Sequence, residues 1–401
     1  MTGYRHTFRQ LTDLLSQHKA LWTESAFVVD RPSWQADYPE LSRALLALSD
    51  SELRAVEQEE DLLRWLLSYL PELEPLQQPW APRASLQWQA TEQTMRGIGA
   101  RKRAQIEGFV NALLGSEVTG PGPAGSVVDW CSGRGHLAHA LSAATEARVL
   151  CLERDLTLHH RLSPERIAFL ALDVLEPLDL AHLSGCDLHT ALHACGDLHL
   201  SMLRQTVAAG VPALACSPCC YHFTREQVYA GVSTPARQSG LRPTRDELRL
   251  ATAETTTANA LERSLRQLER LWRVAFDLHL RELRQVDSYS RTPSVKKSLL
   301  KTSFNQFART LVDQLERKGR RDFLFSPLTP QAEAGLMRRA GAKLATISRL
   351  EKAQLGFRGA LERWLLLDRA LFLQEHGYRV EIQEFCARHH SGRNHVILAG
   401  R

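Results

Sequence analysis

The 401-residue sequence has no long uninterrupted apolar stretch, although 44% of its residues are hydrophobic. No run of about 18 uncharged apolar residues occurs, so we predict no membrane-spanning helix. The N-terminal sequence MTGYRHTFRQLTDLLSQHKA has no apolar block followed by a small-residue cleavage site, which argues against a secretory signal. Cysteine is scarce, with 8 residues, and this excludes a disulfide scaffold. We expect reduced thiols in a cytoplasmic protein without membrane contact.

The net charge is +5, but the charged residues are unevenly distributed along the chain. Residues 1–95 carry 8 basic and 14 acidic residues, whereas residues 291–358 carry 15 basic and 5 acidic residues. A local basic excess attracts polyanions. It is equally typical of a solvated helical face, so both interpretations stay open.

Hydrophobic spacing and turn residues divide the chain into four segments. Residues 1–95 have apolar positions three to four apart, which predicts a helical N-terminal region. From residue 96 to 222, a helix over 100–114 precedes short β-branched runs that alternate with helical stretches. Residues 223–375 are charged and helical in pattern, and residues 376–401 read as a β-hairpin.

This order predicts an α/β fold with a parallel sheet and crossover helices. The helical block interrupts it before the last two strands. The predicted strands of the first part are SVVDW (126–130), RVLCLE (148–153), RIAFLALD (166–173), LHTALHA (188–194) and PALACSP (212–218).

The segment VVDWCSGRGHLAHAL predicts a strand, a glycine turn and a helix. Gly133 and Gly135 allow close approach of the backbone to a ligand, and the helix N-terminus offers free N–H groups. The spacing Gly133-x-Gly135-x-x-Ala138 also fits the dinucleotide fingerprint, so an NAD(P)-dependent oxidoreductase is a competing hypothesis.

Acidic residues close the first three predicted strands. Asp129 would repel a pyrophosphate but suits a ligand that carries an ammonium group. Glu153 can accept hydrogen bonds from both ribose hydroxyls, and Asp173 can accept one from an adenine amino group. This set favours S-adenosyl-L-methionine over NAD.

The pattern D-x-C-S-G-x-G-H-L resembles motif I of class I methyltransferases, with Cys131 in the position of the first glycine. H-A-C-G-D-L (193–198) and S-P-C-C-Y-H (217–222) follow the fourth and fifth predicted strands. Together these motifs resemble the methyltransferase-like family that includes the glutathione S-transferase C-terminal-domain-containing protein. They are more loosely similar to tRNA 2′-O-methyltransferases.

The resemblance covers roughly 95–222 and 379–401. It implies a Rossmann-like sheet of seven strands in the order 3-2-1-4-5-7-6. It also implies that Asp129, Cys131, Gly133 and Gly135 hold the methionine part of the cofactor. In the same way Glu153 would hold the ribose and Asp173 the adenine.

A cysteine and histidine cluster falls at the predicted carboxyl ends of strands one, four and five, where ligands of such sheets bind. Cysteines pack well as small apolar residues, and we expect this for Cys151, Cys186 and Cys386. Cys216-x-x-Cys219 is half of a zinc pattern, but the sequence has no second half. His193, Cys195 and His222 could complete four ligands only by converging in the fold, so a metal site is the minor alternative and none is predicted.

We interpret the cysteine and histidine cluster as part of a pocket for the molecule that accepts the methyl group. His193 is placed to accept a proton, Tyr221 could stack on a ring, and His222 is a second acid–base candidate. Asp197 is expected to cap the following helix. His159 and His160 are expected at the surface.

Basic patches in 291–301 and 316–322, with Phe304, Phe307 and Phe323 nearby, suit single-stranded or loop RNA. Arg101, Lys102 and Arg103 add to this charge. We therefore predict a methyltransferase that acts on RNA, with tRNA as a candidate, or on protein. A non-catalytic RNA-binding protein with a relic cofactor pocket is a further alternative.

Overall fold

The computed structural model describes residues 2–77, 81, 82, 85, 88–120, 125–158, 165–176, 183, 185–253, 260–319 and 325–401. The expectations for His159, His160, Phe323 and residues 320–322 lie outside this range. Contacts divide the chain into two compact units. We name them the sheet unit (residues 1–18, 74–257 and 357–401) and the helical unit (residues 19–73 and 258–356).

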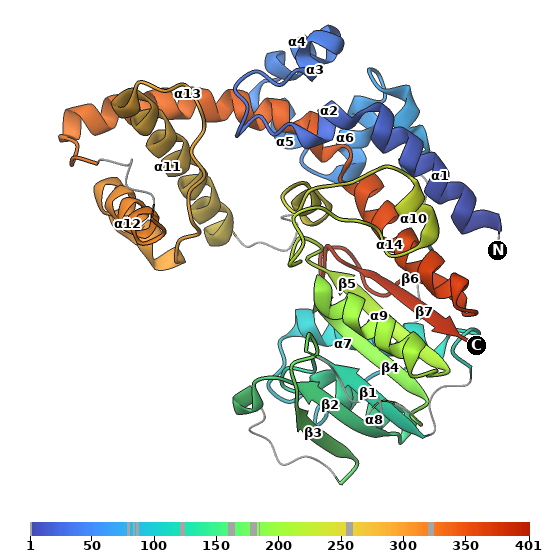
Figure 1. Ribbon diagram of the computed structural model, residues 1–401. Helices are drawn as coiled ribbons and strands as arrows, with labels where there is room; N and C mark the ends of the chain where they lie inside the picture. Colours follow the sequence, from blue (N-terminus) through green and yellow to red (C-terminus); the bar gives the residue numbers. More distant parts are fainter. Residues whose placement is uncertain are drawn as a thin grey trace. The chain divides into compact units, whose positions relative to one another are not determined.

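The sheet unit is built on seven strands in the order β3-β2-β1-β4-β5-β7-β6 (Figure 1). Their bounds are β1 Ser126–Trp130, β2 Arg148–Glu153, β3 Ile167–Ala171, β4 Leu188–Cys195, β5 Ala213–Cys219, β6 Arg379–Glu384 and β7 His395–Gly400. The strands β1 to β5 pair in parallel, and β7 is antiparallel to both β5 and β6. The predicted strand order and C-terminal hairpin are confirmed.

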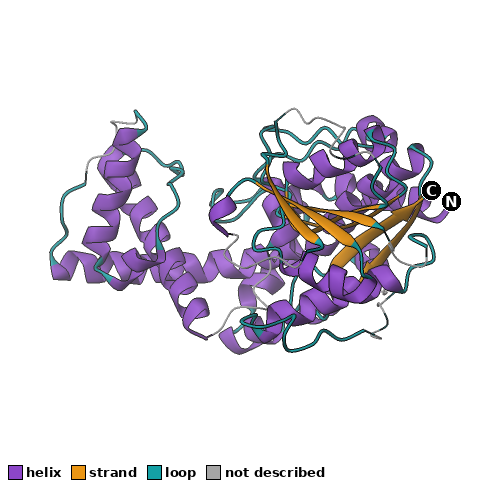
Figure 2. Cartoon of the chain, turned by 90° about the horizontal axis from the view of Figure 1, so that it is seen from below, coloured by secondary structure: helices purple, strands orange, loops and turns teal. Residues whose placement is uncertain are grey.

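Helices cover both faces of the sheet (Figure 2). Helices α7 (Ala100–Leu114) and α8 (His136–Thr145) pack together, and their apolar side chains share one core with β1 and β2. Helices α9 (Asp197–Ala208) and α14 (Arg358–Glu375) contact strands from β4 to β7. Both layers exclude water from the sheet, which is why the central strands are apolar on both sides.

The remaining elements of the sheet unit are short, apart from the first helix. Helix α1 packs along α14 and, together with the strands β6 and β7 and the segment that holds α10 and η4, buries nearly the whole circumference of α14. The bounds are α1 Thr2–Gln17, η2 Leu156–Leu158, α10 Thr234–Gln238 and η4 Glu247–Thr252; η1 (Pro71–Leu76) spans the chain boundary between the two units.

The helical unit is organised around α13 (Pro330–Leu355), which contacts helices from both segments of the unit. Thr329 caps its first turn, because its side chain accepts a hydrogen bond from the Ala332 amide. The other bounds are α2 Lys19–Thr23, α3 Trp34–Asp37, α4 Pro39–Ala47, α5 Asp50–Ala55, α6 Glu59–Leu66, α11 Ala260–Arg284, η5 Lys297–Lys301 and α12 Phe304–Arg317.

The boundaries predicted at 95, 222 and 375 do not coincide with these units. Residues 223–253 and α14 belong to the sheet unit, because α14 buries its side chains against the sheet and α1. Residues 19–73 instead pack with the helical insertion. Hydrophobic periodicity identifies helices but does not say which partner each helix will cover. Within the described part of the chain, no helix is both long and apolar enough to cross a membrane.

Candidate active site

The turn between β1 and α8 places three residues in the left-handed backbone region: Cys131 (φ 54°), Gly133 (φ 57°) and Gly135 (φ 70°). At Gly135 a Cβ would lie 3.0 Å from the Phe169 ring, so a side chain there would be crowded as well as strained. No described atom lies within 4 Å of a Cβ built at Gly133, which leaves the turn open on that side. Cys131 carries a Cβ in this region at a cost on the order of 1–3 kcal/mol.

Asp129 on β1 is a buried carboxylate with one unused oxygen. Asp129 is only 1% exposed. Its Oδ1 accepts a 3.4 Å hydrogen bond from the Thr190 hydroxyl. Oδ2 is buried and has no partner among the described residues. Burial raises the pKa of Asp129 to about 7, which the Thr190 hydrogen bond, the charge of Lys102 and the Ala138 amide only partly oppose. A buried carboxylate oxygen without a partner is stabilised by a cationic or N–H donor.

Glu153 at the end of β2 accepts two backbone hydrogen bonds. The Gly133 amide donates to Oε2 and the Asp155 amide donates to Oε1, both at 3.0 Å. Each carboxylate oxygen can accept a further bond, so hydroxyl groups of a ligand could still bind here. The structure therefore brings the second predicted acid to the glycine turn.

Asp173 lies two residues beyond the end of β3 and is partly exposed. The Leu175 amide donates a 3.1 Å hydrogen bond to Oδ1, and Arg154 lies 3.3 Å from Oδ2. The Leu175 amide and Arg154 lower the pKa of Asp173. The ion pair with Arg154 is exposed and hence weak, so it leaves the carboxylate able to exchange partners.

His193 sits in a β-bulge, where the pairing of β4 with β5 shifts between Leu192 and Ala194, and its φ is 64°. Its Nε2 is 3.2 Å from Gln105 Oε1, and its Nδ1 is buried without a partner among the described residues. Burial, with the charge of Arg393 second, lowers the pKa of His193 to about 4, so the ring is neutral at pH 7. Because Gln105 Oε1 accepts, Nε2 carries the proton and Nδ1 is a free acceptor.

Tyr221 does not fit the predicted stacking role. It is 3% exposed, with the Arg369 guanidinium 4.9 Å from its ring centroid and the His199 ring at 5.9 Å. Its ring is a packing element, because the side chain is buried and Arg369 lies over the ring. His222 is half-buried and its ring packs edge-on at 4.5 Å against the exposed ring of Phe223.

Three cysteines gather at the ends of β4 and β5. The sulfurs of Cys195, Cys219 and Cys220 all lie within 4.8 Å of one another. Hydrogen bonds from the Cys195 and Cys219 thiols lower the pKa of Cys220, and the charge of Arg393 adds to this. Cys216 lies buried within β5 and is not part of the group. The expected apolar packing is confirmed for Cys151, Cys186 and Cys386, all of which are buried.

The segment after β5 is fastened to the segment after β4. The Gly196 amide donates to Cys219 O at 2.9 Å, and the Asp197 amide donates to Phe223 O at 3.0 Å. The N-cap of α9 is Gly196, and Asp197 is the first residue inside the helix; its carboxylate accepts from the Arg225 amide at 2.8 Å. The predicted capping role of Asp197 was therefore wrong, because its side chain turns toward the neighbouring loop.

Sequence reasoning missed Gln105, Thr190 and Arg393. Gln105 is a polar residue on the buried side of α7, beside Ile106 and Phe109, and that position was a usable signal. Thr190 lies inside a buried strand and Arg393 in the hairpin connection, where the local sequence marks no function.

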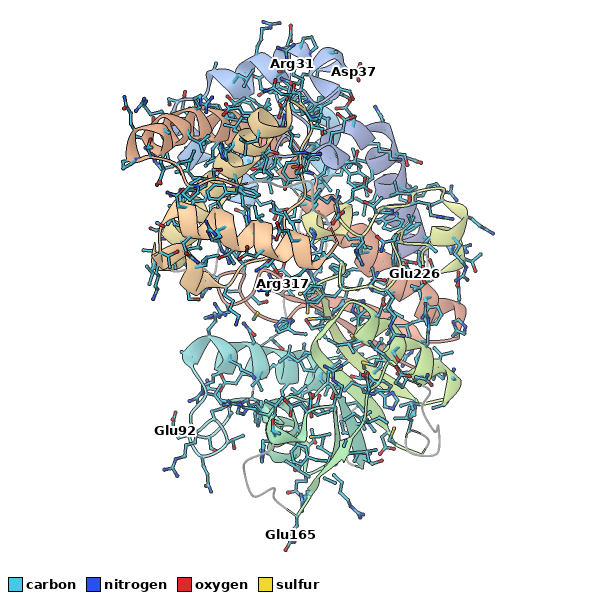
Figure 3. The ribbon with its side chains drawn as sticks, turned by 60° about the vertical axis from the view of Figure 1, so that its left-hand side comes forward. Arg31, Asp37, Glu92, Glu165, Glu226 and Arg317 are labelled. Carbon is cyan, nitrogen blue, oxygen red and sulfur yellow. The ribbon has the colours of Figure 1, made fainter. Side chains whose placement is uncertain are left out.

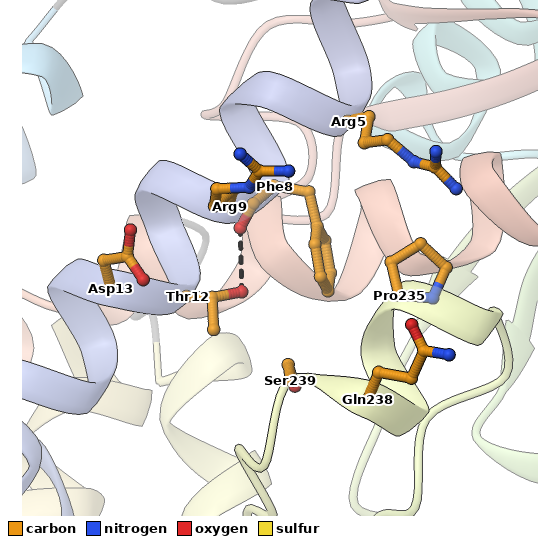
Figure 4. Close-up of a pocket in the computed structure, with 8 residues that line it drawn as sticks. All are labelled: Arg5, Phe8, Arg9, Thr12, Asp13, Pro235, Gln238 and Ser239. Atoms are coloured by element: carbon orange, nitrogen blue, oxygen red, sulfur yellow. Dashed lines mark hydrogen bonds between the residues drawn. The ribbon is translucent and has the colours of Figure 1, made fainter.

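The pocket shown in Figure 4 contains none of these residues. It lies between α1 and the segment around α10, and the Thr12 hydroxyl in its wall donates to Phe8 O at 2.8 Å. We therefore place the candidate active site at the carboxyl ends of β1, β2 and β4, not there.

Comparison with known proteins identifies the class of this region. Residues 101–227 match the family model described as a methyltransferase domain. This range contains the glycine turn, strands β1 to β5 and all of α7 except its first residue, Ala100. The strand order β3-β2-β1-β4-β5-β7-β6 is the Rossmann-like order predicted for a class I methyltransferase, and residues 101–227 are similar to a methyltransferase domain.

A relative from Drosophila pseudoobscura pseudoobscura, the "Glutathione S-transferase C-terminal domain-containing protein homolog", is 28% identical over 180 residues. The match covers 42% of this chain and 29% of the relative, so the chain spans less than a third of that protein. Among solved structures, the cyclopropane synthase MmaA2 from Mycobacterium tuberculosis is 12% identical with a TM-score of 0.25; the match covers 90% of this chain and 96% of that one.

Proposed function

We propose that the chain is an S-adenosylmethionine-dependent methyltransferase with RNA as its acceptor. The observation that carries the cofactor assignment is Asp129, whose buried Oδ2 lacks a donor beside a left-handed turn. An ammonium group would donate a hydrogen bond to Asp129 Oδ2 and would balance the negative charge of the carboxylate. A pyrophosphate at this point would add negative charge to an already unfavourable carboxylate, which disfavours the NAD(P) alternative.

The residues at the strand ends fit the parts of this cofactor. Asp129 would hold the ammonium group, Glu153 the ribose hydroxyls and Asp173 the adenine amino group. The open side of Gly133 would let the ligand approach the backbone. When bound, the cofactor supplies a methyl group on a sulfonium sulfur.

Transfer from a sulfonium is an in-line displacement, so the protein mainly aligns the acceptor and excludes water. His193 Nδ1 is the free acceptor atom at the end of β4. We propose that it takes a hydrogen bond from the acceptor group and so holds the nucleophile in line. The buried Tyr221 has no part in this scheme.

RNA is proposed because the helical unit has exposed basic side chains. Figure 3 labels Arg317 of α12, one of this set, which comprises Lys296, Lys301, Arg309, Arg317, Lys318 and Arg338. The predicted aromatic contribution is wrong for Phe304 and Phe307, which are 1% and 0% exposed and pack against Trp272. Support for RNA is therefore electrostatic, through phosphate contacts.

The cofactor test compares S-adenosylhomocysteine with NADH in thermal unfolding. We expect stabilisation by S-adenosylhomocysteine and none by NADH. Stabilisation by NADH alone would reject the proposed cofactor.

The acceptor test follows labelled methyl groups from S-adenosylmethionine into total RNA and total protein. Label in RNA supports the proposal; label in protein alone moves the acceptor to protein. Absence of label in both, with intact cofactor binding, would favour the relic-pocket alternative.

A charge-reversal variant sharpens the acceptor test. Replacing Lys301, Arg309 and Arg317 with Glu should weaken RNA binding at least ~10-fold and flatten its salt dependence. The matched control reverses the exposed Arg148, Arg204 and Arg379, which lie at strand starts or on α9. Equal losses in both variants would show that the basic helical unit is not the RNA surface.

A further inference from the structure

The three clustered cysteines are held in place by the backbone around them. Cys195 and Cys219 are direct partners in the β4–β5 pairing, and their sulfurs are 3.3 Å apart. Cys220 follows with φ 46°, a left-handed conformation that is costly for a cysteine. This conformation brings the third sulfur beside the other two, within 4.8 Å of each.

The loops that carry these cysteines are tightly joined, so the arrangement is preorganised. At Gly196 a Cβ would lie 1.9 Å from Phe223 O, so only glycine allows the two segments to meet. The Gly196 amide then donates directly to Cys219 O at 2.9 Å. The cluster therefore does not depend on side-chain rotamers alone.

The spacing of the sulfurs matches coordination by one soft ion. A zinc–sulfur bond of ≈2.3 Å in tetrahedral geometry separates two sulfur ligands by roughly 3.8 Å. The observed separations, from 3.3 Å to within 4.8 Å, bracket that value. Small side-chain rotations suffice to reach it.

Charge at the site also suits three thiolates around a divalent ion, an assembly with one net negative charge. The Arg393 charge acts on both Cys195 and Cys220. Arg393 Nε is buried and has no hydrogen-bond partner among the described residues. A net negative centre would provide what this guanidinium lacks.

We propose that Cys195, Cys219 and Cys220 form a zinc(II) site with three thiolate ligands and a fourth position open to water or a ligand. The ion would fasten the ends of β4 and β5 beside His193. Zinc displaces the thiol protons on binding, and no oxidation or reduction is involved. The proposal stands apart from the cofactor and acceptor assignments, since it rests on the positions of the three sulfurs and on Arg393 beside them.

The test uses the full chain, purified under reducing conditions and stripped with a chelator. Titration with cobalt(II) should produce thiolate-to-cobalt charge transfer and the intense d–d bands of a tetrahedral site. Added zinc should abolish both at one equivalent per chain. Absence of these bands in folded, fully reduced protein would overturn the proposal.

Two variants separate this ligand set from the pattern in the sequence. Cys220→Ala should lose cobalt binding by at least ~10-fold, a typical consequence of removing a metal ligand or its support. Cys216→Ala should retain it, although Cys216 forms the C-x-x-C pattern with Cys219. The reverse result would assign the site to the sequence pattern and reject the proposed set.

A measurement on the wild-type chain avoids dependence on variant folding. Zinc should protect Cys195, Cys219 and Cys220 from alkylation, mapped by mass spectrometry, while Cys131 reacts at the same rate with and without zinc. Unchanged alkylation of all four would contradict the site. A Cys195–Cys219 disulfide in protein purified without reductant, which zinc cannot prevent, would also contradict it.

Discussion

The Gly133 amide donates a 3.0 Å hydrogen bond to the Glu153 carboxylate, and this bond joins the turn after β1 to the end of β2. The same carboxylate is the proposed ribose ligand. Glu153 therefore shapes the turn and binds the cofactor, and these two contributions can be separated by substitution.

We expect Glu153→Gln to keep the turn, because the amide oxygen still accepts from Gly133. Cofactor binding should weaken by roughly 10-fold, since a charged hydrogen bond contributes about 1.5–3 kcal/mol. Glu153→Ala should weaken it further and lower thermal stability as well. Titration calorimetry with S-adenosylhomocysteine measures the affinities; unaltered affinity in both variants would remove Glu153 from the site.

Asp129→Asn should stabilise the ligand-free protein at neutral pH. The folded pKa of about 7 exceeds the ordinary value of 3.8, so the folded state binds more protons than the unfolded state between these values. Wild-type stability consequently falls as pH rises through this window. The variant should gain up to roughly 4 kcal/mol above pH 7 and nothing near pH 4.

Urea unfolding of both proteins at about pH 4 and about pH 8 measures this difference. Thr190→Val serves as the control, because it removes the hydrogen bond to Oδ1 but keeps the carboxylate. A difference between Asp129→Asn and wild type that is equal at both pH values would show that Asp129 is already ionised in the folded state.

Cofactor affinity should depend on pH through the same group. An ammonium group favours the ionised carboxylate, so wild-type binding should tighten as pH rises from about 6 to about 7.5. Asp129→Asn should bind more weakly and show little change over this range. A pH response that survives in the variant would place the titrating group elsewhere.

His193 variants distinguish its two ring nitrogens. His193→Asn can present a polar atom near the position of Nδ1, and Asn tolerates the left-handed backbone that φ 64° requires. His193→Gln extends toward the position of Nε2 instead. We expect turnover to fall by ~10²-fold in His193→Ala and His193→Gln, and less in His193→Asn, with cofactor affinity unchanged in all three.

Turnover under saturating cofactor, together with calorimetric affinity, gives the result for each variant. Equal turnover in the Ala, Gln and Asn variants would show that Nδ1 makes no catalytic contact. Loss of cofactor affinity in all of them would instead assign His193 to the cofactor site.

The sheet was predictable because its information is local. The strands β1 to β5 are short, largely apolar runs, and Gly133 and Gly135 mark a turn that few other residues could adopt. The burial of Phe304 and Phe307 could not be predicted from the local sequence. Their burial depends on Trp272, which lies on a separate helix, and charge in the sequence beside them does not reveal that contact.

The candidate site likewise has residues that the local sequence predicts and residues that only the fold brings together. Asp129 and Glu153 follow from their positions at strand ends, whereas Lys102 comes near Asp129 only because α7 packs against α8 and shares one apolar core with β1. The cysteine group shows the limit most clearly. The sequence pattern pairs Cys216 with Cys219, but side chains three residues apart on a strand point to opposite faces of the sheet. Cys195 lies on the neighbouring strand, directly opposite Cys219.

Arg369 should be the residue of α14 whose loss destabilises the fold most. It is fully buried; its Nε donates to His199 Nε2 at 2.9 Å, and its guanidinium donates to the Tyr229 hydroxyl at 3.1 Å. His199 Nδ1 in turn donates to Ala194 O at 3.0 Å, so the network reaches the end of β4. Removing one partner from a buried charged network costs about 3–5 kcal/mol.

We therefore expect Arg369→Met to lower the free energy of unfolding by that amount, and Arg369→Lys to restore little of it, because an ammonium cannot reach both partners with fixed geometry. Arg363→Met on the same helix is the control; it gives up a 2.8 Å bond to Leu76 O at a half-buried position and should cost less. Urea unfolding compares the three. If Arg369→Met and Arg363→Met cost the same, the buried network contributes no more than the half-buried interactions of Arg363, and the end of β4 must be held by the sheet alone.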